Sequence, residues 1–101
     1  MARVRRRKSP DDDPVQAAES VLPDIMMSYG RFREKRPVML LDLQSQKIYA
    51  YPYKEFKAEL CERSQVMMAA DYEEAIAENK IVVFVRDDEP RRLVSMLFDY
   101  E

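Results

Sequence analysis

The sequence predicts a small α+β domain: a four-stranded sheet built from two hairpins in a β-β-α-β-β core, with helices on one face. Three observations predict this class. Four short runs rich in β-favouring residues occur in two pairs, a long stretch with helical periodicity separates the pairs, and 101 residues suffice for one small domain. A helical segment and a disordered N-terminal arm are expected before this core.

The arm is expected to cover residues 1–14, and the domain residues 15–101. The first 14 residues hold two prolines, eight charges and few apolar side chains. Such a segment buries too little apolar surface to offset the entropy lost on ordering.

The helical segment is expected to begin at Pro14, in the first turn, with Asp13 as its N-cap. Its apolar residues fall on one face: Val15, Ala18, Val21 and Leu22. Pro23 is expected to end or kink this helix near Leu22. A second helical segment follows from Asp24 to Arg36 before Pro37 stops it.

The strands are expected at Val38–Leu43, Ile48–Tyr51, Ile81–Val85 and Leu93–Phe98. A buried helix remains an alternative for the first run, because it is too short and too apolar for periodicity to decide. If the first and third strands pair at the centre, they should run parallel. Asp42 is expected at a strand end, where its carboxylate bonds to the following turn.

Residues 53–79, between the hairpins, have helical spacing. A stripe of residues three or four apart begins at Tyr53 and Phe56 and continues through Leu60, Ser64 and Met67. Asp71 and Glu74 resemble a capping box, which would place a break near Ala70. Whether this region is one helix or two stays open.

The composition argues against catalysis and against cofactor or metal binding. The chain has no histidine, one cysteine (Cys61) and one glycine (Gly30). General acid–base chemistry, zinc sites and phosphate-binding loops draw on these residue types. We therefore expect a protein that is not an enzyme, has no cofactor, no metal site and no evident small-molecule substrate.

The same features predict a cytoplasmic protein. A lone cysteine cannot form an internal disulfide. The basic start is followed by Ser9–Pro14 rather than by an apolar stretch, so no signal peptide is expected, and no run is long enough to span a membrane.

The charges are unevenly distributed, although the net charge is −2. Five cations occur within residues 3–8, namely Arg3, Arg5, Arg6, Arg7 and Lys8. The chain after residue 13 carries 12 basic and 16 acidic residues, a net charge of −4. Nucleic-acid binding is thus expected through the arm, if anywhere, rather than through the domain.

The residues that favour partner binding are tyrosines and methionines. Tyr49, Tyr51 and Tyr53 alternate, so they could form a row of contact residues or could be covered by the following helix. Arg91 and Arg92 would supply charges at the rim, and Met26 and Met27 a second surface. We expect a non-catalytic interaction or regulatory module that forms a homodimer or binds another protein. The alternative is a nucleic-acid-associated protein that uses the arm.

Overall fold

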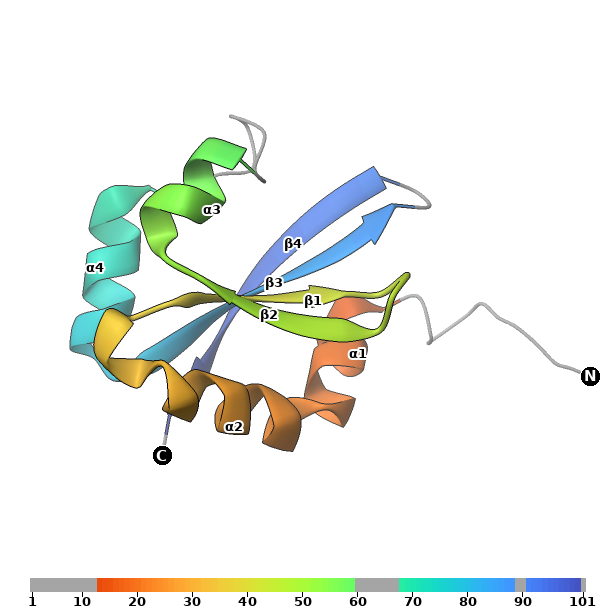
Figure 1. Cartoon of the computed structure of the whole chain (residues 1–101), viewed down its shortest axis with the longest axis horizontal. Coiled ribbons are helices and arrows are strands. Elements are labelled where there is room, and N and C mark those ends of the chain that lie inside the picture. The colour runs from red at the N-terminus through yellow and green to blue at the C-terminus, as the bar shows by residue number, and fades with distance from the viewer. Residues whose placement is uncertain (1–12, 60–67, 89–90, 101) are drawn as a thin grey trace, which may run out of the picture.

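The computed structural model describes residues 13–59, 68–88 and 91–100. The elements follow one another along the chain as α1 (Pro14–Ser20), α2 (Leu22–Arg31), a 3₁₀ turn (Arg33–Lys35), β1 (Val38–Asp42), β2 (Lys47–Tyr51), α3 (Tyr53–Glu59), α4 (Ala69–Ala77), β3 (Lys80–Asp88) and β4 (Arg91–Asp99) (Figure 1). The fold is therefore of the α+β class.

The four strands form one mixed sheet in the order β2-β1-β3-β4. Each hairpin pairs antiparallel, and the two hairpins meet where β1 and β3 run parallel, with Met39 aligned to Val83. This confirms the four-stranded sheet and the parallel pairing of the central strands. It also excludes the alternative of a buried helix at residues 38–43.

Helices cover both faces of the sheet, so the expectation of helices on one face was wrong. Alternate residues of β1 and β3 point to opposite faces. On one face Met39 and Val83 join a core that includes Ile25 of α2, and on the other Leu40 and Phe84 join a core that includes Phe56 of α3. Figure 1 shows α1 and α2 below the sheet, and α3 and α4 above it and to its left.

The reason lies in the two central strands, because both faces of each are apolar. Val38–Asp42 is buried at every position. A sheet with two apolar faces needs cover on both sides. The first helical region supplies the second layer, and it packs on its own sheet through Ala18, Ile25 and Tyr29.

The helix boundaries follow local signals, with two differences from expectation. The Asp13 side chain caps α1 by accepting a hydrogen bond from the Val15 backbone N–H at 3.0 Å. The first helix ends before Pro23, as expected, but α2 already begins at Leu22 rather than at Asp24, so that Pro23 lies in its first turn, where a missing N–H costs nothing. Asp71 does not cap α4, because that helix already begins after Met68, one turn earlier than a capping box at Asp71 requires.

Two parts of the expected organisation lie outside the described residues. The predicted arm does so, except for Asp13 and Pro14, which begin α1. The middle of the 53–79 region also lies outside the described residues. It contains Cys61 and the stripe residues 60, 64 and 67. Within the described part, α3 and α4 are separate segments.

Asp42 binds the turn that follows β1, as expected, and it also ties the end of β1 to β3. Its carboxylate accepts hydrogen bonds at 3.0 Å from the Gln44 backbone N–H and from the Arg86 guanidinium, and the residue is 8 % exposed. Burial by itself would raise the pKa of Asp42, but the hydrogen bonds from Arg86 and Gln44 outweigh it and hold that pKa below its usual value.

We expect Asp42→Asn to lower the free energy of unfolding by about 2 kcal/mol at pH 7, because a buried charged hydrogen bond is lost. Because its pKa is lowered in the folded state, the ionised carboxylate stabilises the fold at neutral pH. This stabilisation is lost as the pH falls through the folded-state pKa. Urea unfolding measured from neutral pH to pH 3 should show that the difference in free energy of unfolding between the native chain and the variant becomes smaller as the pH falls. A gap that is constant over this range would contradict the assignment.

Candidate functional site

β4 forms one edge of the sheet and is the longer of the two edge strands. It spans nine residues, whereas β2 at the opposite edge spans five. Within residues 13–59, 68–88 and 91–100, β4 pairs with β3 alone. A long edge strand presents a row of unpaired backbone groups to which another strand can add.

The backbone groups at this open edge can be assigned from one hydrogen bond. The Tyr100 N–H donates to the Asn79 carbonyl at 2.9 Å, which continues the β3–β4 ladder by one pair. Hydrogen-bonded and non-hydrogen-bonded pairs alternate in an antiparallel ladder. The residues whose N–H and C=O point away from β3 are therefore those at positions 91, 93, 95, 97 and 99.

The side chains of β4 differ between its two faces. Met96, Phe98 and Tyr100 pack against the core that α1 and α2 cover. On the other face Ser95 is exposed, and Leu97 has 45 % of its surface exposed. α4 packs against β3, and this leaves apolar surface uncovered at the outer strand.

An open groove of about 360 Å³ lies between α4 and β4. Its lining residues are Asp71, Glu74, Ala75, Glu78 and Leu97. The three carboxylate residues are exposed; Asp71 and Glu74 lie in α4 and Glu78 is its C-cap, whereas Leu97 comes from β4. We call this feature the acidic groove; it combines an apolar contact with negative charge beside unpaired backbone groups.

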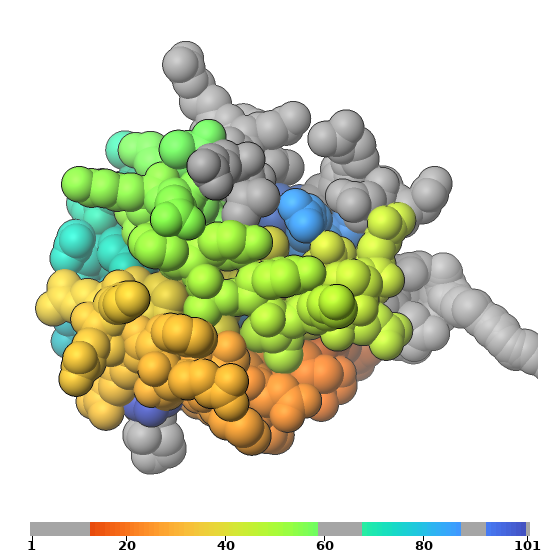
Figure 2. All heavy atoms as spheres, in the orientation of Figure 1, coloured from red at the N-terminus to blue at the C-terminus, as the bar shows by residue number. Residues whose placement is uncertain are grey.

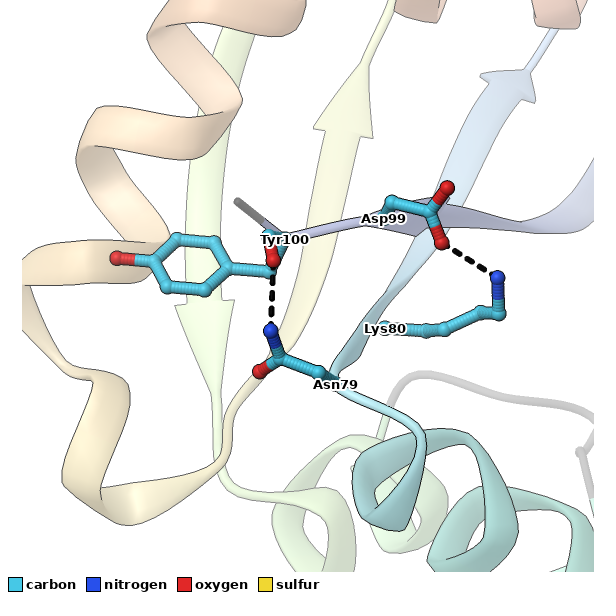
Figure 3. Close-up of polar contacts among 4 residues, drawn as sticks. All are labelled: Asn79, Lys80, Asp99 and Tyr100. Carbon is cyan, nitrogen blue, oxygen red and sulfur yellow. Dashed lines mark hydrogen bonds and ion pairs between the residues drawn. The ribbon is translucent and has the colours of Figure 1, made fainter.

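The end of β4 is held firmly against the start of β3 (Figure 3). Asn79 follows α4 in the left-handed region, with φ of 63°, a conformation that asparagine adopts more readily than most residues. Its side-chain amide donates to the Tyr100 carbonyl at 2.7 Å, and its own carbonyl accepts from the Tyr100 N–H. Beside it, the Lys80 ammonium pairs with the Asp99 carboxylate.

Tyr100 also joins β4 to α2. Its ring centroid lies 4.9 Å from that of Tyr29, and the Arg33 guanidinium lies 5.1 Å from the centre of the Tyr100 ring. The single glycine fits this contact, because a Cβ atom at Gly30 would lie 3.2 Å from the Tyr100 hydroxyl. The open edge therefore belongs to a strand whose end is fixed.

The predicted tyrosine row is half-buried beside α3. The Tyr49 and Tyr51 rings lie 6.0 Å apart, and Tyr51 lies 6.3 Å from Phe56. Tyr53 stacks on Tyr72 at 4.4 Å. All three tyrosines pack against the core under α3 and α4. Figure 2 shows α2 in orange and β2 and α3 in green on the same face.

Tyr72 connects this cluster to the loop before β1. Its hydroxyl donates a hydrogen bond to the Arg36 carbonyl. Burial, with a smaller contribution from Glu73, raises the pKa of Tyr72 to about 12. The neutral phenol is therefore the form that the fold requires, and it fixes α4 beside the sheet.

The structure does not bring the predicted contact residues together. The tyrosine row lies on and after β2, and Arg91 and Arg92 begin β4 at the opposite edge of the sheet. The side chains of those two arginines lie outside the described part of the chain, as do Arg3, Arg5, Arg6, Arg7 and Lys8.

The methionine pair is also divided. Met26 packs against the core beneath α2, whereas 62 % of the Met27 surface is exposed. Of this predicted pair, Met27 is therefore the residue whose side chain a partner could contact.

Sequence reasoning missed the open edge and its groove. The available signal was the run Leu93–Phe98, which is apolar enough for a covered strand yet has one hairpin partner. What the sequence does not reveal is that α4 lies over β3 rather than over β4.

Comparison with known proteins gave no matching family model, no matching curated protein and no matching solved structure. None of the described helices has the length and apolarity needed to cross a bilayer. Among the described residues, no three histidine, cysteine or acidic side chains are grouped so that they could hold a metal ion.

We expect Asn79→Ala to lower the free energy of unfolding by about 2 kcal/mol, since it removes a hydrogen bond and places an ordinary side chain in the left-handed region. The matched variant Asn79→Gly keeps that conformation accessible and should lose about 1 kcal/mol. Urea unfolding at equal protein concentration measures both losses. A loss from glycine as large as that from alanine would contradict the role of the backbone conformation.

Proposed function

We propose that this protein is a non-catalytic interaction module that associates with a second copy of itself through the open edge of β4. The observation that carries the proposal is the nine-residue edge strand with an apolar centre and an exposed Leu97. Strand addition at such an edge is a common mode of protein recognition, in which main-chain hydrogen bonds supply affinity and side-chain contacts supply specificity.

A long, apolar edge strand is unfavourable when its backbone groups and side chains are left in water. Proteins protect edge strands by keeping them short, by placing charges or proline in them, or by covering them. β4 is long, and its central residues from Leu93 to Phe98 carry no charge and no proline. Pairing with another strand would satisfy the backbone groups and cover Leu97.

The opposite edge is less suited to this role. β2 is shorter, and α2 packs against it. The tyrosines of β2 already contact the core under α3. The exposed Met27 on α2 is a smaller apolar feature, and it serves here as the control surface.

We expect the native chain to have twice the 12.0 kDa mass of one chain in light scattering, in low and in high salt. Leu97→Lys should weaken dimerisation at least about tenfold, because it places an ammonium group in the apolar contact. Met27→Lys puts the same charge on α2 and should leave the mass unchanged. A native monomer at all concentrations, or a mass that responds to the Met27 variant alone, would refute the proposal.

The alternative function is nucleic-acid association through the basic arm, supported by the five cations within residues 3–8. It predicts oligonucleotide binding that falls steeply with salt and disappears when residues 1–13 are deleted. Self-association through β4 should survive that deletion. Fluorescence anisotropy with a labelled single strand and light scattering on the same two proteins therefore separate the functions.

A further inference from the structure

We infer that the acidic groove is completed by the β4 strand of a second copy, paired antiparallel about a two-fold axis at Ser95 so that position 91 of each copy lies beside the groove of the other. This inference rests on the proposed self-association and specifies the partner segment and its register.

The direction of pairing follows from the two ends of β4. The strand begins with Arg91 and Arg92 and ends with Asp99. Parallel pairing of two copies would bring like charges together at both ends. Antiparallel pairing brings the basic start of each strand to the acidic end of the other, and opposite charges directly across a sheet are favourable.

The register follows from the length of the strand and its apolar residues. Ser95 is the middle residue of β4, so an axis at Ser95 lets all nine residues pair. Leu93 then lies opposite Leu97 of the second copy, and Arg91 opposite Asp99. An axis at Val94 or Met96 would pair seven positions, and an axis at Leu93 or Leu97 five; each of these would lose the contact between positions 91 and 99.

The hydrogen-bonding pattern permits this register. Leu93, Ser95 and Leu97 direct their N–H and C=O groups toward the open edge, as the Tyr100–Asn79 hydrogen bond indicates. With the axis at Ser95, each of these residues faces another residue of the same set. Ser95 of each copy can then donate its N–H to the Ser95 carbonyl of the other.

The acidic groove supplies the charge that position 91 of the second copy requires. Residues opposite one another in an antiparallel pair point to the same face of the sheet. Position 91 of the second copy, across from Asp99 and next to Leu97, therefore lies on the face that bears Asp71, Glu74 and Glu78. The Asp99 carboxylate has 84 % of its side-chain surface exposed despite its pairing with Lys80, so it is accessible to a second cation.

Disulfide trapping tests the register in full-length protein with Cys61→Ser as background. Ser95→Cys should form a disulfide-linked dimer on oxidation, because opposite residues in a hydrogen-bonded pair have Cα atoms about 5.5 Å apart. Leu93→Cys and Leu97→Cys should each fail to cross-link alone, since four residues of offset separate the thiols by roughly 13 Å. A mixture of these two variants should form the mixed disulfide. Light scattering under reducing conditions first establishes that each variant is dimeric.

The possible outcomes separate this inference from the proposed function. Cross-linking by Ser95→Cys and by the mixed pair supports both. Cross-linking by Leu97→Cys or Leu93→Cys alone would overturn the register while preserving association through β4. A native dimer in which no β4 variant cross-links would overturn the register at Ser95, although self-association would stand. A native monomer would overturn both.

Discussion

The parallel pairing of β1 with β3 is the constraint on which the rest of the structure depends. It joins two antiparallel hairpins at the centre of the sheet, so their outer strands, β2 and β4, become opposite edges. Because β1 is buried at every position, and β3 from Ile81 to Val85, both faces of the sheet need helices. α1 and α2 cover one face, and α3 and α4 cover the other.

Within the described part of the chain, this arrangement leaves Ser95, Leu97 and Asp99 of β4 exposed. α4 lies over β3, and the acidic groove separates it from the outer strand. Meanwhile Asn79 and Tyr100 fix the end of β4 to β3 and to α2. A rigid strand with one open edge loses little conformational entropy when another strand pairs with it, which favours association.

Much of the fold could be predicted from the sequence because the signals are local. The strand runs, the Asp13 cap and the Asp42 turn depend on residues close in the chain. The second helical layer could not be predicted, because the sheet face on which Ala18 and Ile25 pack depends on the path of the whole chain. The candidate site was missed for a similar reason. The exposure of Leu97 depends on the position of α4 in the fold, which the sequence near Leu97 does not determine. The tyrosines were predicted as contact residues from their alternating spacing alone, and in the structure they are half-buried.

Amide hydrogen exchange, measured residue by residue at several protein concentrations, tests the central claim most directly. The amides of Val94, Met96 and Phe98 face β3 and should be protected at every concentration. The account predicts that the amides of Ser95 and Leu97 are protected in concentrated protein and lose that protection on dilution, while the outward amides of β2 stay unprotected throughout. Ser95 and Leu97 amides that exchange as fast as those of the β2 edge at every concentration would contradict it.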